Sequence, residues 1–355
     1  MKTYFIQIIN IQKETDNAVS LSFDIPPGLY ETFSYKPGQY ITLIFNLNGK
    51  EVRRSYSICS NPFEEEPLQI AIKRVEKGLV SNHINDYLKI GDFIEVLPPE
   101  GHFSASIDPK NYKSYYLFAA GSGITPILSI IKSVLNQEPE SYLYVLYGNS
   151  NENTIMFKKE LDKFQNHYEN RLFLQHILSR PKSKWSDLWE KEKPYKTGRI
   201  DETSIKAFIN ENPPYAQNAE YYICGPGSMI EHTKNTLKTL DVPETRIFFE
   251  SFGSNTKDTQ KKGVESLLTF ELEGEKHQIH VPENDTILRA ILDAGHKPNY
   301  GCEGGVCGKC VAKTTQGETF MNHNMALSDD EVKSGMTLTC QAHPKTHEVS
   351  IVFQE

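Results

Sequence analysis

The pattern of apolar and polar positions changes character twice along the 355-residue chain. In the first 100 or so residues, β-branched and aromatic residues recur in short runs. Turn signals such as Pro37-Gly38, Asn48-Gly49 and Pro98-Pro99 separate these runs. The runs predict strands at residues 4–9, 18–23, 39–45, 51–58, 69–75 and 93–96, with a single helix at 79–88. So many short strands in this length indicate a β-barrel.

From residue 110 onward, buried strand-like runs alternate with segments of helical period. The expected strands are 115–120, 143–147, 172–178, 221–224 and 247–250. The expected helices are one that ends at residue 135 and others at 156–164, 204–210 and 229–240. Strands that alternate with helices in this way predict a doubly wound parallel sheet, an α/β domain with helices on both faces.

A polar segment at 253–263 has few apolar residues and is typical of a linker. Beyond it, residues 266–273 and 277–281 predict a hairpin around Glu273-Gly274-Glu275. We expect Asp285 to cap a helix that runs through Ala294 and stops at Gly295. A last strand is expected at 347–353. These patterns predict a small domain of mixed sheet and helix.

A cysteine cluster follows that helix. Cys302, Cys307 and Cys310 have C-x4-C-x2-C spacing, and Cys340 follows far downstream. This is the plant-type [2Fe–2S] pattern, in which four thiolates hold two irons. Glycines surround the cysteines because backbone N–H groups must approach the sulfur atoms closely.

Other interpretations of the cysteines remain open at this point. Zinc also takes four thiolates, but zinc ribbons usually show two C-x2-C pairs, and here only Cys307 and Cys310 form one. A disulfide framework is typical of small secreted domains, and this chain is neither small nor visibly secreted. Four unrelated core cysteines would not cluster in this way. The remaining cysteines, Cys59 and Cys224, fall in separate segments and are expected to be unpaired.

From about Ser266 to its end, the chain resembles the plant-type ferredoxins. The resemblance implies an α+β, ferredoxin-like (β-grasp) domain. It also implies that all four clustered cysteines are metal ligands: Cys302, Cys307, Cys310 and Cys340. A ferredoxin only carries electrons, so the rest of the chain should supply them.

Two features of the first domain suit a flavin nucleotide. In Arg54-Ser55-Tyr56-Ser57, strand alternation places Arg54 and Tyr56 on one face, where a guanidinium and a ring suit a phosphate and a flat ring system. Ordinary strand surface is the competing interpretation of these four residues. Gly78 precedes the single helix, and a free helix N-terminus can bind an anion.

The middle domain has a glycine turn between its first strand and its first helix. Gly121-Ser122-Gly123-Ile124-Thr125-Pro126 lacks the third glycine of the Rossmann fingerprint, and the second strand closes as Tyr147-Gly148-Asn149 without a carboxylate. Pro126 suits the first turn of a helix, where its missing N–H costs nothing. A second motif is Cys224-Gly225-Pro226. By itself, Cys224 is better interpreted as a small buried apolar residue at the end of a strand, because free cysteines are mostly buried.

Together these motifs resemble the ferredoxin–NADP reductase family, which has R-x-Y-S and G-x-x-S in its flavin domain. The resemblance implies a Greek-key FAD-binding barrel. In it Arg54 would hold the FAD pyrophosphate, Tyr56 would pack along the isoalloxazine, and Ser57 would hydrogen-bond near flavin N5. Gly78 and the backbone of Val80 and Ser81 would help to bind the pyrophosphate. A few relatives use FMN, but these motifs favour FAD.

The same resemblance covers the nucleotide domain, because the family carries G-x-G-x-x-P and C-G-P there. It implies that the first loop, with the G-x-G-x-x-P motif, contacts the pyrophosphate of the nicotinamide nucleotide. The second loop, with the C-G-P motif, would lie near the nicotinamide ring. The residues concerned are Gly121, Gly123, Thr125 and Pro126 in the first loop, and Cys224, Gly225 and Pro226 in the second. In relatives, an aromatic residue at this place shields the flavin face until the nicotinamide displaces it. Phe252 is the candidate here, and a core residue is the competing interpretation.

Ser179-Arg180 ends the third strand of the nucleotide domain. In the family, a Ser-Arg at this place holds the 2′-phosphate of NADPH. A fixed guanidinium and a hydroxyl are groups that suit a phosphate. NADPH is therefore expected in preference to NADH, and the competing interpretation of Arg180 is a solvated loop residue.

The expected domains are 1–105 (FAD-binding barrel), 106–252 (NAD(P)H-binding), 253–263 (linker) and 264–355 (ferredoxin). The net charge of −8 argues against nucleic-acid binding and against an anionic membrane surface. No apolar run approaches transmembrane length, and Met1 leads directly into a strand-like segment without a signal-peptide core. With thiols that must stay reduced, this favours the cytoplasm.

These expectations describe an enzyme that passes electrons from NADPH to FAD, to the cluster and then to an outside redox protein. The order flavin, nucleotide, ferredoxin resembles the reductase components of oxygenases, among them the phenylacetyl-CoA epoxidase reductases of phenylacetate catabolism. A reductase of a hybrid-cluster protein shares this order and is the nearest alternative. An electron carrier or redox sensor without NAD(P)H turnover is an alternative of a different class.

Overall fold

The computed structural model describes residues 2–182, 195–216, 218–252, 261–272 and 274–354. The chain divides into two compact units. One contains Lys2–Val52 and Tyr56–Ser251, and the other contains Arg53–Ser55 and Phe252–Glu355. In the described ranges, no helix is long and apolar enough to cross a membrane.

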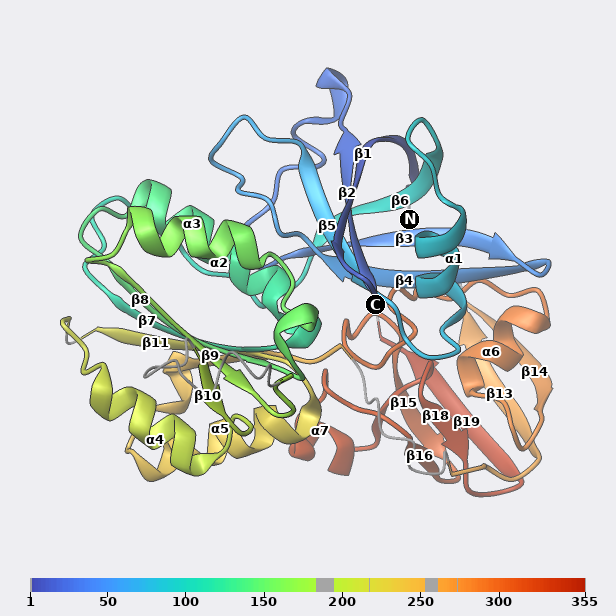
Figure 1. The fold of residues 1–355 in the computed structure, drawn as a ribbon. Helices are drawn as coiled ribbons and strands as arrows, with labels where there is room; N and C mark the ends of the chain where they lie inside the picture. Colours follow the sequence, from blue (N-terminus) through green and yellow to red (C-terminus); the bar gives the residue numbers. More distant parts are fainter. Residues whose placement is uncertain (1, 183–194, 217, 253–260, 273, 355) are drawn as a thin grey trace. The chain divides into compact units, whose positions relative to one another are not determined.

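The N-terminal part is an antiparallel barrel, as the short strand runs predicted (Figure 1). Within the described residues its sheet has the strand order β4-β3-β6-β1-β2-β5. An antiparallel bridge between Ile58 and Ile70 links the end of β4 to β5 and closes the sheet. With β6 beside β3, the order β6-β3-β4-β5 is a Greek key. The strands are β1 (Tyr4–Thr15), β2 (Ala18–Asp24), β3 (Tyr40–Leu47), β4 (Lys50–Ser57), β5 (Leu68–Lys73) and β6 (Phe93–Glu100).

The barrel's helix α1 (Leu79–Tyr87) connects β5 to β6, where the sequence predicted a helix. Strand β1 is longer than expected, because it continues from residue 9 to Thr15. That extension is polar and has little apolar signal. It is held as a strand by antiparallel pairing with β2, in which Lys13 lies opposite Val19 and Thr15 opposite Ala18.

The nucleotide domain is a parallel sheet with the order β10-β9-β8-β7-β11-β12 in the described ranges. Figure 1 shows α2 and α3 on one face of this sheet and α4 and α5 on the other. The strands are β7 (Ser114–Ala120), β8 (Tyr142–Asn149), β9 (Leu172–Leu178), β10 (Tyr195–Thr197), β11 (Ala219–Cys224) and β12 (Ile247–Glu250). The helices are α2 (Ile124–Gln137), α3 (Lys158–His167), α4 (Glu202–Glu211) and α5 (Gly227–Thr239). The predicted doubly wound α/β domain is confirmed.

Two details of this domain differ from expectation. The prediction missed β10, whose three residues pair in parallel with β9 and are too few to give a periodic signal. The predicted start of α3 at residue 156 was wrong. Phe157 has a left-handed backbone (φ +56°), so the helix begins only at Lys158. Short 3₁₀ turns lie at Pro27–Leu29, Gly121–Gly123, Glu152–Thr154 and Glu244–Arg246.

The barrel and the nucleotide domain share one apolar core. The buried cluster around α2, β7 and β8 also includes Cys59, Phe103 and Ala105, which come from the barrel and its exit. Phe103 meets Tyr222 of β11 edge to face, with ring centroids 5.6 Å apart. The first two domains are therefore packed as one body.

The second unit is an α+β domain of the β-grasp type. Its described residues form a sheet of order β14-β13-β19-β15-β17, in which β13 and β19 run parallel and the other pairs antiparallel. A two-stranded sheet pairs β16 with β18. The strands are β13 (Ser266–Leu272), β14 (Glu275–Val281), β15 (Val311–Gln316), β16 (Thr319–Met321), β17 (Met336–Leu338), β18 (Ala342–Pro344) and β19 (Glu348–Phe353); the helices are α6 (Ile287–Asp293) and α7 (Asp329–Lys333).

The predicted hairpin is confirmed as β13 and β14, although Glu273 and most of the predicted linker (253–260) lie outside the described residues. The predicted cap of α6 was wrong by one residue. Thr286, not Asp285, accepts the hydrogen bond from the backbone N–H of Arg289, at 3.2 Å. Gly295 ends the helix with φ +90°, as expected for a left-handed stop.

The order of the nucleotide sheet creates a topological switch point beside β7. The chain builds β8, β9 and β10 outward on one side and then returns to place β11 on the other. The loops that follow β7 and β11 therefore meet at the carboxyl edge of the sheet, where ligands bind in such folds. A Cβ on Gly123 would lie 2.1 Å from the carbonyl oxygen of Cys224, so only glycine permits this approach.

We predict that Gly123→Ala destabilises the nucleotide domain. The clash is with backbone atoms of Cys224 and Gly225, which cannot rotate away, and overpacking of this kind costs about 1–3 kcal/mol or more. Thermal unfolding followed by circular dichroism should show a lower midpoint than for the wild-type chain.

Gly227→Ala is the matched control for this prediction. Gly227 opens α5 just beyond the same loop, and a Cβ there would meet nothing within 4 Å. Its unfolding midpoint should stay level or rise slightly, since alanine favours helix more than glycine does. Equal midpoints for the two variants would show that the close approach is not a constraint.

Candidate functional site

The flavin motif lies on the last residues of β4. Arg54 and Tyr56 are half-buried and share one side of the strand, as alternation predicted. Tyr56 packs against the apolar core of the barrel. Ser57 is buried, 3% exposed, on the opposite side. Arg54 supplies a cation and Tyr56 an aromatic surface on one side of the strand, which suits a flat ring system with a phosphate. Ser57 supplies a hydroxyl next to them in the chain.

Gly78, Val80 and Ser81 lie at the start of α1. Gly78 is the N-cap residue, and no side chain caps the helix. The first turn contains no acidic residue, so its N–H groups and the helix dipole are available to an anion. A Cβ on Gly78 would lie 2.5 Å from the Ser81 hydroxyl oxygen, and that oxygen accepts from the backbone N–H of Val75 at 3.1 Å. The Ser81 hydroxyl therefore closes the turn onto the residue at position 75.

A buried polar group joins the barrel to the nucleotide domain at the switch point. The Ser57 hydroxyl donates to the Glu250 carboxylate at 3.2 Å, and both side chains are buried. Cys224 ends β11, which pairs in parallel with β12, and it lies opposite Glu250 in that register. Burial, with the nearby Glu250 charge, raises the pKa of the Cys224 thiol well above its usual value. Cys224 is therefore a neutral thiol near pH 7.

Sequence reasoning missed Glu250. It treated this residue only as the end of a strand. The available signal was topological: Cys224 and Glu250 both end parallel strands, and such ends meet at one edge of the sheet.

The phosphate loop takes the expected shape. Gly121 has φ +56°, residues 121–123 form a single 3₁₀ turn, and α2 begins at Ile124. The Thr125 hydroxyl donates to the Ser122 carbonyl at 3.0 Å, and Pro126 lies in the first turn of the helix. The loop backbone is thereby presented at the carboxyl edge of β7.

Lys73, at the end of β5, was not singled out from the sequence. Its ammonium nitrogen lies 3.5 Å from the place that a Cβ on Gly121 would take. Burial lowers the pKa of this lysine, so its charge is poorly solvated and an anionic partner would stabilise it. A cation from the barrel therefore stands beside the phosphate loop of the neighbouring domain.

Ser179 and Arg180 directly follow β9, where the sequence placed them. The Arg180 backbone N–H donates to the Ser150 carbonyl at 2.7 Å, and its exposed guanidinium is 3.5 Å from the Ser150 hydroxyl. Two hydroxyls and a guanidinium thus border the ends of β8 and β9. Glu152 also lies there, accepting from the Lys182 backbone N–H at 3.0 Å, and is a carboxylate that the sequence analysis did not consider.

Phe252, the predicted shield of the flavin, is 44% exposed and belongs to the second unit. Ser251 before it is buried and belongs to the first. The shielding role of Phe252 stays a prediction.

The four clustered cysteines form two pairs in the second unit. The thiols of Cys302 and Cys307 are within hydrogen-bonding reach of each other, and so are those of Cys310 and Cys340. Backbone amides converge on the sulfur atoms: Gly304 and Cys307 donate to Cys302 Sγ at 3.3 and 3.4 Å. A plant-type cluster needs this arrangement, since each of its irons takes two thiolates.

The chemistry of this donor set fits a [2Fe–2S] cluster. The hydrogen bond from Cys307, together with backbone amides, lowers the pKa of Cys302 to about 5, so a thiolate is stabilised there. The pairing of Cys302 with Cys307 and of Cys310 with Cys340 fits two irons that each take two thiolates.

Three family models match successive parts of the chain. Residues 6–105 match an oxidoreductase FAD-binding domain, residues 117–235 an oxidoreductase NAD-binding domain, and residues 270–345 a 2Fe-2S iron-sulfur cluster binding domain. The matches follow the flavin, nucleotide and ferredoxin order expected from the sequence.

Similar proteins share the whole length of the chain. One component of the 1,2-phenylacetyl-CoA epoxidase of Escherichia coli (strain K12) is 34% identical over 98% of this chain and 97% of its own. The ferredoxin reductase component of 3-ketosteroid-9-alpha-monooxygenase from Rhodococcus rhodochrous is 30% identical over 99% of this chain and 97% of its own. The solved structure of phthalate dioxygenase reductase, at 23% identity, covers 99% of this chain and 98% of its own with a TM-score of 0.68, and shares the fold. The chain therefore belongs to the reductase family in which an FAD-binding domain, an NAD-binding domain and a [2Fe–2S] domain follow one another in a single chain.

Proposed function

We propose that this reductase passes electrons from NADPH to a partner oxygenase of the phenylacetyl-CoA epoxidase type. When bound, FAD would take a hydride from the nicotinamide and release its two electrons one at a time to the cluster. The protein contributes binding, orientation and exclusion of water. No side chain needs to act as a general acid or base.

The observation that carries this proposal is the contact of Ser57 with Glu250 beside Cys224. Ser57 belongs to the flavin motif, whereas Cys224 and Glu250 end strands of the nucleotide domain. Their meeting supports a site where a flavin held by the barrel and a nicotinamide held by the sheet lie face to face. The neutral Cys224 thiol would add no charge where a hydride passes. The Ser57 hydroxyl donates to Glu250, so its oxygen could still accept a hydrogen bond from the flavin ring edge.

The remaining residues of the motifs would hold the two nucleotides. Arg54 and the first turn of α1, with Gly78, Val80 and Ser81, suit the FAD pyrophosphate. The loop of Gly121, Gly123, Thr125 and Pro126 would face the pyrophosphate of NADPH, with Lys73 beside it, and Gly225-Pro226 would border its nicotinamide. Cys302, Cys307, Cys310 and Cys340 would ligate the cluster.

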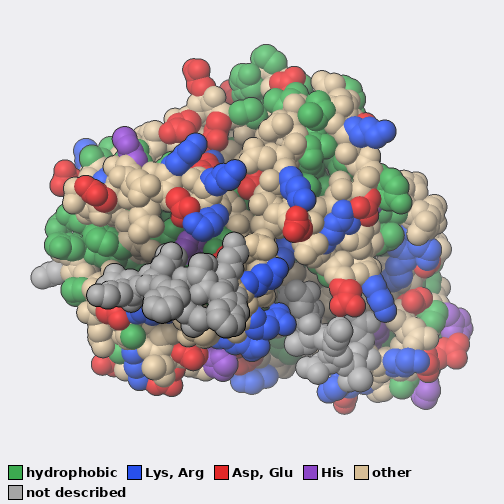
Figure 2. All heavy atoms as spheres, in the orientation of Figure 1, with side chains coloured by type: hydrophobic (Ala, Val, Ile, Leu, Met, Phe, Trp, Pro, Cys, Tyr) green, Lys and Arg blue, Asp and Glu red, His purple; other side chains and the backbone are tan. Residues whose placement is uncertain are grey.

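An oxygenase partner is supported by the relatives, two of which are named as oxygenase components. The chain carries a net charge of −8. Figure 2 shows that acidic and basic side chains both occur across the face drawn. The net negative charge suggests that the partner's docking surface carries basic residues, with coupling that weakens as salt is added.

We predict that Cys307→Ser separates two activities of the purified protein. Ferricyanide can take electrons at the flavin, so NADPH–ferricyanide reductase activity should remain. Reduction of cytochrome c, which needs single electrons from the cluster, should collapse, and the iron content should fall. Both assays and an iron determination on one preparation measure this.

Cys59→Ser is the matched control. Cys59 is a buried thiol of the barrel that donates to the Gln69 carbonyl at 3.4 Å, a bond that serine can replace. It should keep iron and both activities. If the Cys307 variant kept both activities as well, the cluster would not lie on the main electron path, and stoichiometric zinc in place of iron would overturn the cluster assignment.

We also predict that Arg180→Ala lowers the kcat/KM for NADPH and spares that for NADH. A hydrogen bond to a charged group contributes about 1.5–3 kcal/mol, which corresponds to a loss of about 10- to 150-fold. NADH has no 2′-phosphate to lose, so it is the internal control. Steady-state kinetics with both nucleotides decide the point.

An equal loss for NADPH and NADH would mean that Arg180 only supports the fold. A wild-type preference for NADH would contradict the proposed specificity. In that case the Glu152 carboxylate would be the candidate group to accept hydrogen bonds from the ribose hydroxyls of NADH.

A further inference from the structure

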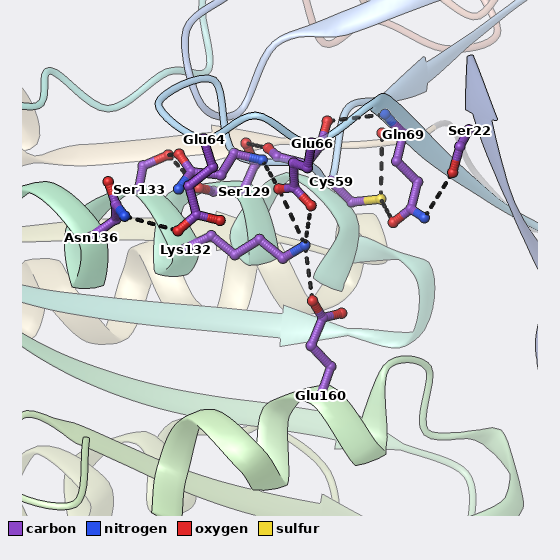
Figure 3. Close-up of polar contacts among 12 residues, drawn as sticks. Ser22, Cys59, Glu64, Glu66, Gln69, Ser129, Lys132, Ser133, Asn136 and Glu160 are labelled. Carbon is purple, nitrogen blue, oxygen red and sulfur yellow. Dashed lines mark hydrogen bonds and ion pairs between the residues drawn. The ribbon is translucent and has the colours of Figure 1, made fainter. Parts of the chain in front are cut away.

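A row of polar side chains on α2 faces the barrel. Ser129, Lys132, Ser133 and Asn136 recur at helical spacing, so they lie on one side of the helix. Figure 3 shows them directed at the barrel segment 59–66, which follows β4. The sequence pattern alone predicted α2 as an apolar helix and gave no role to this row.

Each end of the row makes a direct contact across the two domains. The Ser129 hydroxyl donates to the Ser60 carbonyl at 2.7 Å, in a fully buried setting. The Ser133 hydroxyl lies 3.1 Å from Asn61 Oδ1, also buried. One turn further on, the Asn136 amide donates to Glu64 at 2.8 Å, at the surface. The segment is thus bound along two turns of the helix.

Lys132 lies at the centre of this row and is only 7% exposed. Its ammonium is 3.4 Å from Glu66 of the barrel segment and 2.9 Å from Glu160 of α3. Glu66 also accepts from the backbone N–H of Asn61. Burial by itself would lower the pKa of Lys132, but Glu160 and Glu66 together raise it, so the side chain stays charged.

Both ends of this network lead to the proposed site within a few residues. Ser57, the last residue of β4, precedes Ser60 by three positions, and it contacts Glu250. On the other side, α2 begins directly after the glycine turn 121–123. The network therefore connects the strand that carries the flavin motif to the helix that carries the phosphate loop.

We infer that Lys132 is a positioning residue, which holds the barrel segment 59–66 on α2 and thereby sets how the nicotinamide meets the flavin. This inference rests on the proposed function. Lys132 contacts Glu66 and Glu160 and acts only through them. Removing one partner of a buried ion pair leaves the others uncompensated, so Glu66 and Glu160 would repel each other in its absence. The segment would then shift on the helix.

The test compares Lys132→Met with Lys132→Arg in the full-length protein loaded with FAD. The methionine keeps the apolar stem and removes the charge, whereas arginine keeps the charge. Because a misplacement of about 1 Å can cost about 100-fold in rate, we expect Lys132→Met to slow flavin reduction by NADPH at least about tenfold. The kcat should fall with KM little changed, and arginine should restore most of the rate.

Two readouts do not depend on turnover. Amide hydrogen exchange in residues 58–66 should accelerate in Lys132→Met and stay near wild type in Lys132→Arg. The change in the flavin absorbance spectrum on adding NADP⁺ to the oxidised protein should weaken in the methionine variant. If Lys132 served stability alone, the spectral change on adding NADP⁺ would remain that of the wild type in the methionine variant.

Lys113→Met is the matched control. Lys113 forms a partly buried ion pair with Glu220 at 2.7 Å, and both residues belong to the nucleotide domain. Its loss should lower the unfolding midpoint without changing exchange in 58–66 or the rate of flavin reduction. If Lys113→Met slowed flavin reduction as much as Lys132→Met, or if Lys132→Met left it unchanged, the inference would be overturned.

Glu160→Gln decides the question if Lys132→Met does not fold. It removes the shorter ion pair from the α3 side and leaves Lys132 paired with Glu66, so a smaller change in the same readouts is expected. No change would contradict the inference.

The wild-type protein distinguishes failure of the proposed function from failure of the positioning role. If it does not oxidise NAD(P)H, the proposed function fails, whereas normal wild-type turnover with unaffected Lys132 and Glu160 variants rejects only the positioning role.

Discussion

The close approach of two backbone loops at the switch point is the constraint on which the nucleotide site depends. Gly123 lies so near the Cys224 carbonyl that no side chain could stand between them. This contact brings the turn after β7 and the turn after β11 to one edge of the sheet. The phosphate loop, the Cys224 thiol and the Glu250 carboxylate are neighbours because the strands that carry them are parallel and adjacent.

The barrel reaches this edge through buried contacts of two kinds. Apolar residues of the barrel and its exit complete the core around α2, and buried polar contacts connect α2 to the segment after β4. The apolar part stabilises the packing but is not directional, since it depends mainly on buried area. Hydrogen bonds and the ion pairs of Lys132 specify one register of the segment on the helix, because each depends on distance and angle. A hydride transfer between two bound rings needs that precision.

The cysteine loop meets a different requirement, which is to gather four thiolates in a small space. Backbone amides from the glycine-rich loop offset the negative charge at the sulfur atoms, as the amides of Gly304 and Cys307 do for Cys302. Positive φ values at Gly305 and Gly308 allow the loop to turn without the strain that a side chain would add there. Hydrogen bonds of this kind also tune the potential of a bound cluster.

Local features of the sequence were sufficient to predict most elements of the first two domains and the class of fold of each domain, and they predict the cluster ligands by their spacing. Turn residues, strand runs and C-x4-C-x2-C spacing each act over a few positions, so they can be read without the fold. The ends of elements were less certain, as at Phe157 and Thr286, because a backbone twist or a competing cap decides them. The contact of Glu250 with Ser57 and the role of Lys132 could be found only in the tertiary structure. Their importance comes from partners 193 residues away in the case of Ser57 and Glu250, and 66 in the case of Glu66 and Lys132. Such pairs leave no local pattern, because chain topology and packing, rather than spacing along the sequence, bring them into contact.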